Sequence, residues 1–313
     1  MTMLRRTSWI ALLLALLLVL AGCATDTADT VADDSPLATE APAATEAPAT
    51  TEAPTTTAAP FDVEAAVIEY VSTIPEGWMS AGNLESFKEA VAAQDPFLLD
   101  VRQPGEYEEG HIPGAVNIPL RELGEHIDMI PTDRPVIVYC KSGWRAGIGV
   151  SSLAMMGFDN VKAFGGGWNA WSGAEEEVEM EANVAEVIGD PGLQPELVEA
   201  VAEFLATIPE GWLGAGDAQG VSDAIDAGAF VIDVREPGEF AEGHLPGAVN
   251  IPVRSLGTAD VEIPTDQPII EYCKSGYRAS LALPVLHMLG YDLTKGFSGS
   301  WLAWTEAEMP VET

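Results

Sequence analysis

The chain has 313 residues, of which 47% are hydrophobic, and its formal charge is −35 because 49 Asp and Glu outnumber 14 Lys and Arg. Such acidity repels the phosphates of DNA and RNA, so no nucleic acid is expected among its partners. The roughly 250 residues after position 60 suit two domains of ordinary size, each with its own core.

The first 22 residues have the pattern of an export signal. Arg5 and Arg6 precede an apolar stretch that is shorter than a typical transmembrane helix. The small pair "AG" then stands directly before Cys23, which resembles bacterial lipoprotein precursors and implies a lipidated Cys23. We therefore expect an exported protein, anchored to the outer face of the bacterial cell membrane. The alternatives are an ordinary secretory peptide with a chance cysteine and a twin-arginine signal, which the surrounding residues fit poorly.

Residues 23–60 contain almost nothing that can build a core. The motif "TEAP" occurs three times, amid Ala, Thr and Pro. Such a composition is typical of a disordered or semi-extended tether. The threonines are candidate sites for sugars.

A long internal repeat organises the rest of the chain. "LLDVRQPGEYEEGHIPGAVNIPLR" at 98–121 returns as "VIDVREPGEFAEGHLPGAVNIPVR" at 231–254, with an offset of 133. "TIPEGW" at 73–78 and 207–212 shifts by one further residue. Because this period far exceeds that of repeat arrays, the unit is a whole domain. We expect domains at 61–178 and 195–313, joined by a linker at 179–194.

In each copy, apolar runs of strand length alternate with amphipathic stretches of helix length, which predicts an α/β domain with a parallel sheet flanked by helices. In the first copy we expect helices near 63–72, 83–93 and 120–129, one that opens near Arg145, and a short one that carries Trp168 and Trp171. Strands are expected near 97–101, 115–118, 135–139 and 161–164, and "QPGEYEEGHIPG" is expected to be loop. The two tryptophans, like Trp301 and Trp304, are expected to pack in the core.

The segment "VYCKSGWRA" at 138–146 and its copy "EYCKSGYRA" at 271–279 each place a cysteine after an apolar strand. The carboxyl ends of buried parallel strands are where open α/β sheets bind ligands. Gly143 allows a tight turn, and the helix near Arg145 directs free N–H groups toward the sulfur of Cys140. Such donors favour the thiolate over the thiol.

"DVR", "EGHIPGAVNIP" and "YCKSGWRA", in that order, resemble the rhodanese (sulfurtransferase) domain family over about 80–178 and 213–310. The resemblance implies a cysteine that attacks the outer sulfur of a small anionic donor such as thiosulfate. It carries this sulfur as a persulfide and passes it to cyanide or a thiol. By position, Cys140 and Cys273 are the sulfur carriers. The cradle residues are Lys141, Ser142, Gly143, Trp144 and Arg145, with Lys274, Ser275, Gly276, Tyr277 and Arg278 in the second copy.

Loop length separates this chemistry from phosphoester hydrolysis. Related phosphatase loops place five residues between the cysteine and the arginine, whereas four intervene here. A narrower ring of N–H donors suits a single sulfur atom. Unlike many two-domain relatives, in which the first copy has lost its cysteine, both copies keep the loop, so two active centres are expected.

The charge and position of the other repeated polar residues indicate their roles. Arg145 and Arg278 either contact substrate or tie the loop to a carboxylate, for which Asp100 and Asp233 are the candidates. His111 and His244 are expected to fix a loop by hydrogen bonds. The cations of the paired motifs, which form a local positive site suited to a small anion, are Arg102, Lys141, Arg145, Arg235, Lys274 and Arg278. Lys141 and Lys274 are expected to attract the donor.

Two further points concern the cysteines. A disulfide between Cys140 and Cys273 is the simplest alternative in an exported protein, but equivalent positions at the floors of two separate sites argue against it. No metal site or cofactor is expected, because no Cys or His lies near another at ligand spacing.

Val138 of the first copy corresponds to Glu271, whose carboxylate in a buried strand must be paired or have a raised pKa.

The leading hypothesis is thus a surface-tethered tandem sulfurtransferase. A second is a non-catalytic persulfide carrier or binding module in an exported sulfur relay. A third, a structural lipoprotein held by a disulfide, predicts no free thiol. The two cysteine loops are the features on which all three depend.

Overall fold

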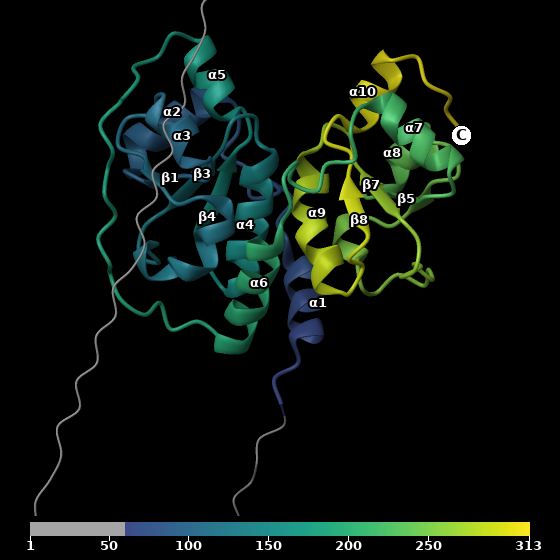
Figure 1. Cartoon of the computed structure of the whole chain (residues 1–313), viewed down its shortest axis with the longest axis horizontal. Helices are drawn as coiled ribbons and strands as arrows, with labels where there is room; N and C mark the ends of the chain where they lie inside the picture. Colours follow the sequence, from purple (N-terminus) through teal and green to yellow (C-terminus); the bar gives the residue numbers. More distant parts are fainter. Residues whose placement is uncertain (1–59) are drawn as a thin grey trace, which may run out of the picture. The chain divides into compact units, whose positions relative to one another are not determined.

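Each repeat folds around four short parallel strands, as the alternation of strand-length and helix-length segments predicts. The computed structural model describes residues 60–313, so the export signal and most of the tether lie outside the described residues. The strand orders are β2-β1-β3-β4 and β6-β5-β7-β8, and every pairing is parallel. Figure 1 shows each sheet with helices on its two faces.

The elements of the first repeat follow the expected order closely. They are α1 (Val63–Thr73), α2 (Leu84–Gln94), β1 (Phe97–Asp100), α3 (Pro104–Glu108), β2 (Val116–Asn117), the 3-10 helices η1 (Leu120–Glu125) and η2 (Ile127–Met129), β3 (Val136–Tyr139), α4 (Trp144–Met156), β4 (Val161–Phe164) and α5 (Gly167–Gly173).

The second repeat has the same order with one 3-10 helix fewer. Its elements are α6 (Pro195–Thr207), α7 (Ala218–Asp226), β5 (Phe230–Asp233), α8 (Pro237–Ala241), β6 (Val249–Asn250), η3 (Val253–Ser255), β7 (Ile269–Tyr272), α9 (Tyr277–Met288), β8 (Thr294–Gly296) and α10 (Ser300–Glu306).

Two local details differ from the expected pattern. The helix expected at 120–129 is formed by a pair of 3-10 helices. Leu120 and Leu123 are both fully buried, and a spacing of three residues places both on one side of a 3-10 helix. The segment expected to be loop contains the short helix α3, which Pro104 opens at a position where its missing N–H costs nothing.

The central strand of each sheet explains where the cysteines lie. All four residues of β3 are buried, and so are all four of β7. Each strand is paired on both sides, and Cys140 or Cys273 follows its last residue. The sequence therefore places both cysteines at the carboxyl edge of a buried parallel sheet.

Helices α4 and α9, which follow the two cysteine loops, pack against each other. They approach each other closely at Gly147, where an added Cβ atom would collide with the side chain of Ser280. Apolar residues of both repeats share one buried cluster around this helix pair. Among residues 60–313, no helix is both long and apolar enough to span a bilayer.

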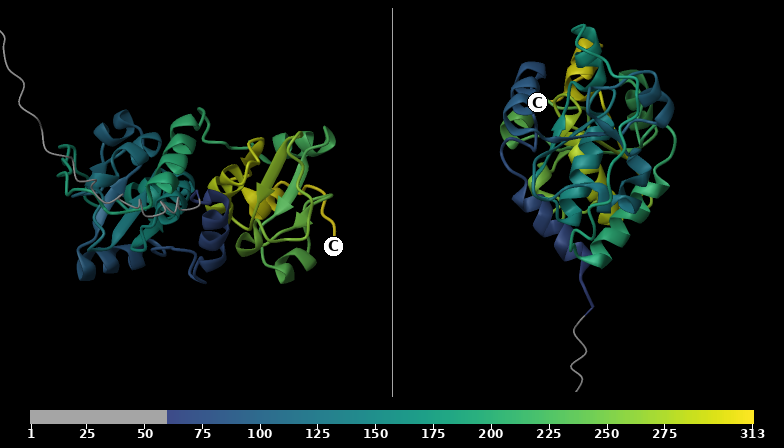
Figure 2. Two further views of the ribbon diagram at one scale, coloured as in Figure 1. Left: turned by 90° about the horizontal axis from the view of Figure 1, so that it is seen from below. Right: turned by 90° about the vertical axis from the view of Figure 1, so that its left-hand side faces the viewer.

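The first helix of each repeat lies against the other repeat. The main contacts of α1 are with η3 of the second repeat, and those of α6 are with η1 of the first. Figures 1 and 2 show α6 beside the first domain and α1 beside the second. The two repeats thus exchange their opening helices.

Candidate active site

Each cysteine sulfur receives a hydrogen bond from the loop that follows it. The Gly143 amide donates to Cys140 Sγ at 3.2 Å, and the Gly276 amide donates to Cys273 Sγ at the same distance. Both cysteines are free thiols, and each is only 1% exposed. Each loop therefore presents one backbone amide that can stabilise negative charge formed on the sulfur during a reaction.

The turn in each loop requires glycine. Gly143 has φ of 97° and Gly276 has φ of 94°, in the left-handed region that other residues rarely adopt. A Cβ on Gly143 would also collide with the carbonyl of Gly165, and one on Gly276 with the carbonyl of Ser298. The helix then begins at Trp144 or Tyr277, one residue before the expected position.

The carbonyls of each loop accept hydrogen bonds from the first turn of α5 in the first repeat and of α10 in the second. In the first repeat, the Trp168 amide donates to the Cys140 carbonyl at 2.8 Å and the Asn169 amide to the Lys141 carbonyl at 2.9 Å. The amides of Trp301 and Leu302 bond the equivalent carbonyls of the second loop, both at 3.0 Å. The loop backbone is therefore fixed on both sides of the sulfur.

The loop arginines pair with carboxylates, but not with the expected ones. Arg145 donates two hydrogen bonds to Glu106, of 2.6 and 2.8 Å, and Arg278 donates two of the same lengths to Glu239. The expectation of Asp100 and Asp233 was wrong, because the short helix after each of these strands presents a glutamate closer to the loop. The hydrogen bond from Arg145 lowers the pKa of Glu106.

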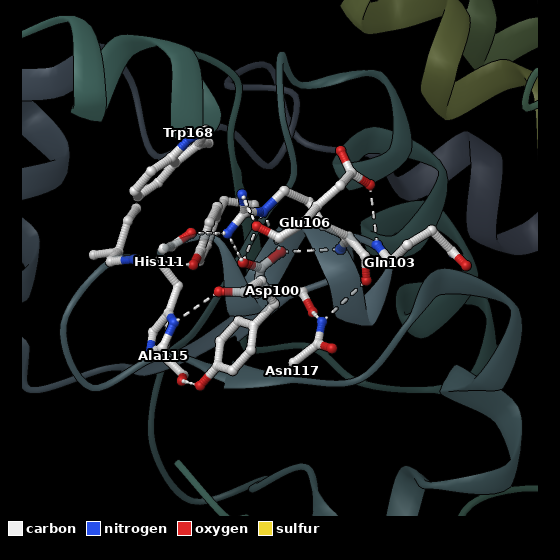
Figure 3. A network of polar contacts seen from close by, with 12 residues as sticks. Asp100, Gln103, Glu106, His111, Ala115, Asn117 and Trp168 are labelled. Carbon is white, nitrogen blue, oxygen red and sulfur yellow. Dashed lines mark hydrogen bonds and ion pairs between the residues drawn. The ribbon is translucent and has the colours of Figure 1, made fainter. Parts of the chain in front are cut away.

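Asp100 instead forms an ion pair with Arg102, two residues further along the chain. Arg102 Nη2 donates to Asp100 at 2.6 Å and to the Gly110 carbonyl at 2.8 Å, and its Nη1 donates to the Glu106 carbonyl at 2.9 Å. Figure 3 shows the polar network around Asp100 and Glu106. Asp233 and Arg235 form the same buried pair in the second repeat. These pairs hold the segment that carries the glutamate partner of the loop arginine.

The two histidines lie in the same segments. His111 is fully buried, its Nδ1 lies 3.1 Å from the Tyr107 carbonyl, and its ring stacks on that tyrosine. His244 is placed equivalently on Phe240. This geometry ties the loop together and places neither ring against a sulfur.

The rim of the first site is open and carries the loop tip. Lys141 and Ser142, like Lys274 and Ser275 of the second loop, are exposed. A cavity of about 1020 Å³ is lined by the whole loop from Cys140 to Arg145. Trp212 and three residues of the second loop, Ser275, Gly276 and Tyr277, also line it. Both cysteine loops thus border one hollow.

Of the four tryptophans expected in the core, Trp304 is buried, and the other three are partly buried and pack against the core clusters. Trp168 lies under Arg102 and Trp301 under Arg235, at 4.8 and 4.6 Å from ring centre to guanidinium carbon. Trp171 packs edge-on against Phe87, and Trp304 against Phe297. All four rings pack within their own repeat, against the segments that support the loops.

The second centre differs from the first beside its sulfur. Glu271 is fully buried and neither of its carboxyl oxygens has a hydrogen-bond partner. Burial raises its pKa well above the usual value, and the charge of the Cys273 sulfur raises it further. Of the two expected states, a paired carboxylate is therefore wrong, and the raised pKa is what the structure supports.

Ser300 is a second difference. It occupies the position of Gly167 and keeps the glycine-like backbone, with φ of 51°. Its Oγ accepts a hydrogen bond from the Cys273 amide at 3.1 Å and lies 3.8 Å from Cys273 Sγ. The sequence signal for it is the replacement of glycine by serine in "GSW" against "GGW".

The chemistry available at these sites is that of a thiol. Within residues 60–313, no group of three or more His, Cys, Asp or Glu side chains is placed to hold a metal ion. Each sulfur accepts a hydrogen bond from one backbone amide and lies near one arginine, and in the second repeat the Ser300 hydroxyl is also close. Such a site can hold an anionic sulfur and an anionic group beside it.

A parallel α/β domain with a supported cysteine at the carboxyl end of its central strand defines a class of proteins that form covalent intermediates on sulfur. The rhodanese-like domain family matches residues 83–174 and 217–307. The chain belongs to this rhodanese family, with two domains in tandem.

Most of the chain is homologous to known sulfurtransferases. It is 30% identical to the 3-mercaptopyruvate sulfurtransferase of Escherichia coli K12, in an alignment that covers 66% of this chain and 85% of the relative. It is 27% identical to the thiosulfate sulfurtransferase of Corynebacterium glutamicum, over 81% of this chain and 95% of the relative. The crystal structure of SseA, a 3-mercaptopyruvate sulfotransferase from Escherichia coli, matches with a TM-score of 0.35 and 23% identity, over 70% of this chain and 98% of that one.

Proposed function

We propose that this rhodanese-type protein moves sulfane sulfur from a small anionic donor to a thiophilic acceptor through persulfides on Cys140 and Cys273. The observation that carries the proposal is the pair of amide hydrogen bonds, Gly143 to Cys140 and Gly276 to Cys273, each 3.2 Å long. Two equivalent thiols with equivalent donors support two working centres.

The chemistry follows from the groups at each sulfur. The cysteine thiolate attacks the outer sulfur of thiosulfate, the bond between the two donor sulfurs breaks, and sulfite leaves with the electron pair. Cyanide or a thiolate then attacks the outer sulfur of the persulfide and frees the cysteine thiolate. The loop amide stabilises the anionic sulfur at the start and the end of this cycle.

The donor is held by positive charge near the loop. Lys141 stands exposed at the rim, and Arg145 presents a fixed guanidinium beside the sulfur. Both thiosulfate and 3-mercaptopyruvate, the donors named for the relatives, are anions that such a site attracts. We take thiosulfate as the first donor to test, with 3-mercaptopyruvate as its competitor.

The test is turnover of thiosulfate and cyanide by four proteins: the native sequence, Cys140→Ser, Cys273→Ser and the double variant. The proposal predicts activity in both single variants and none in the double variant. Turnover that survives in the double variant would refute it. A protein that forms persulfide without turnover would instead be the non-catalytic carrier.

We further propose that the protein is exported and held at the outer face of the cell membrane by lipid on Cys23, with residues 24–60 as the tether. The support is the order of arginines, apolar stretch and "AGC" in the sequence. Partition of the bacterially expressed protein into detergent should be lost in Cys23→Ser. Equal partition of both proteins would contradict the anchor.

A further inference from the structure

The exchange of opening helices is built on equivalent residues in the two repeats. Gly124 at η1 faces Ala202 of α6, and Gly257 just after η3 faces Ile68 of α1, so closely in both cases that an added Cβ would collide. Gly124 and Gly257 are equivalent positions of the repeat, as are Ile68 and Ala202. The exchange is therefore a reciprocal feature of both repeats.

The same exchange carries a tryptophan across. After α6, the segment "TIPEGW" ends at Trp212, whose ring lies 4.4 Å from the guanidinium carbon of Arg121 and 4.9 Å from that of Arg145. Arg121 also donates to the Ile208 carbonyl in this segment. Trp212 thus belongs to the second repeat but stacks on the loop arginine of the first.

The reverse arrangement is present at the second centre. Trp78, at the end of the first "TIPEGW", lies 4.1 Å from Arg254 and 5.5 Å from Arg278. Arg254 donates to the Ile74 carbonyl at 2.8 Å. The loop arginine of each centre is therefore placed between a glutamate of its own repeat and a tryptophan of the other.

A hydrogen bond from each cysteine loop strengthens the link. Trp144 Nε1 donates to the Trp212 carbonyl at 2.9 Å, and the Tyr277 hydroxyl lies 3.0 Å from the carbonyls of Trp78 and Met79. Trp78 and Trp212 both have positive φ, 53° and 57°. A non-glycine residue keeps such a backbone only where its surroundings fix it.

The size of each loop side chain, Trp144 or Tyr277, matches the residue of the other repeat that it faces. A Cβ on Gly296 would collide with the ring of Trp144, so the larger loop residue faces a glycine of β8. The equivalent residue on β4 is Ala163, whose amide bonds the Met79 carbonyl that the smaller Tyr277 contacts. The side chains of Trp144 and Tyr277 thus each pack against the other repeat.

We propose that Trp212 and Trp78 are positioning residues that act across the repeats: Trp212 holds Arg145 at the Cys140 centre, and Trp78 holds Arg278 at the Cys273 centre. Burial alone would lower the pKa of Arg145, but the bond to Glu106 and the charge of the Cys140 sulfur raise it, so guanidinium and sulfur interact. Loss of either tryptophan frees the arginine beside one sulfur, so that sulfur loses a fixed positive charge next to it and reacts more slowly as a nucleophile. This inference rests on the proposed function only for the identity of the working thiols.

The test is alkylation by iodoacetamide across a pH series, followed by intact mass. It uses full-length Cys23→Ser protein with one further cysteine replaced, so that either Cys140 or Cys273 is the single thiol. Trp212→Ala should slow alkylation of Cys140 on the order of tenfold at the neutral pH values of this series. The same change should leave the alkylation rate of Cys273 within about twofold of its original value. Trp78→Ala should instead slow Cys273 and leave Cys140 within about twofold.

The direction of the effect separates positioning from loss of structure. Both thiols are buried, so local unfolding would expose them and speed alkylation. Trp212→Phe and Trp78→Phe, which keep a ring, should show smaller slowing with the same cross-repeat pattern, and they serve if the alanine variants do not fold. Equal effects on both thiols, an effect on the thiol of the same repeat, or faster alkylation would overturn the proposal. Because alkylation needs no sulfur donor, a failure of sulfur transfer leaves this result interpretable.

Discussion

Arg145 and Glu106 form a two-pronged ion pair, with one hydrogen bond of 2.6 Å and one of 2.8 Å, directly beside the cysteine loop. The guanidinium is 8% exposed, while the carboxylate is one-third exposed. The glutamate therefore acts as the fixed support of the arginine, from a helix whose position Asp100 and Arg102 secure.

Glu106→Gln should impair the Cys140 centre selectively. The amide replaces one charged acceptor with a donor, so Arg145 loses a charge-assisted bond worth about 1–3 kcal/mol. In a Cys273→Ser background, kcat/KM should fall about tenfold or more, whereas in Cys140→Ser it should stay within about twofold. Glu239→Gln is the matched control with the reverse expectation. A uniform loss in all four proteins would show that the pair serves general stability only.

Gly143→Ala should abolish the first centre and spare the second. The added Cβ collides with the Gly165 carbonyl, and an alanine at position 143 would also have to adopt a positive φ. The turn that directs the amide at Cys140 therefore cannot persist. Turnover in Cys273→Ser should drop at least about a hundredfold. Gly105→Ala is the control, since nothing lies within 4 Å of the added atom. Full activity of Gly143→Ala would contradict the role of this amide.

The contact of α4 with α9 should show strong coupling between Gly147 and Ser280. Gly147→Ala drives a Cβ into the serine side chain, which should cost about 1–3 kcal/mol of unfolding free energy. Ser280→Gly removes the colliding atoms, so the double variant should be more stable than the sum of the single changes. Chemical denaturation measures all three, and strict additivity would refute the close approach.

Glu271 should make stability depend on pH. Its folded pKa is raised by burial and by the Cys273 sulfur, so the unfolded chain gives up this proton at lower pH than the folded one. The contribution of Glu271 to the free energy of unfolding is fully present below the pKa of the unfolded chain. It declines by up to about 1.4 kcal/mol per pH unit as the pH rises, until the pKa of the folded protein is reached. Denaturation at a series of pH values from 4 to 8 should show the native chain losing stability relative to Glu271→Gln. Glu271→Val, which copies Val138 of the first repeat, should share the flatter curve of Glu271→Gln. Parallel curves for all three proteins would mean that the carboxyl is not buried as the structure places it.

The sequence predicts the strands and the cysteine loops well because their cause is local. An apolar run followed by "CKSG" places the thiol at a strand end and the turn after it, whatever the rest of the chain does. The partner of Arg145 is different, because Glu106 lies 39 residues away in a segment whose short helix is set by the buried Asp100–Arg102 pair. The repeat of "PGEY" as "PGEF" was the available signal.

The contact of Trp212 with Arg145 was beyond local reasoning. It depends on how α1 and α6 exchange between the repeats, and each helix reads as an ordinary opening helix of its own domain. The repeated "TIPEGW", with its offset one residue longer than the rest, marks this segment but says nothing of which domain it contacts. Ser300 and the state of Glu271 likewise follow from packing around one strand end.

The most direct test of two sulfur-carrying centres is the intact mass of Cys23→Ser protein after exposure to thiosulfate, with each remaining cysteine replaced in turn. The protein with both thiols should gain about 64 Da, each single variant about 32 Da, and the double variant nothing. A gain that persists without both cysteines, or none in any form, would contradict the account.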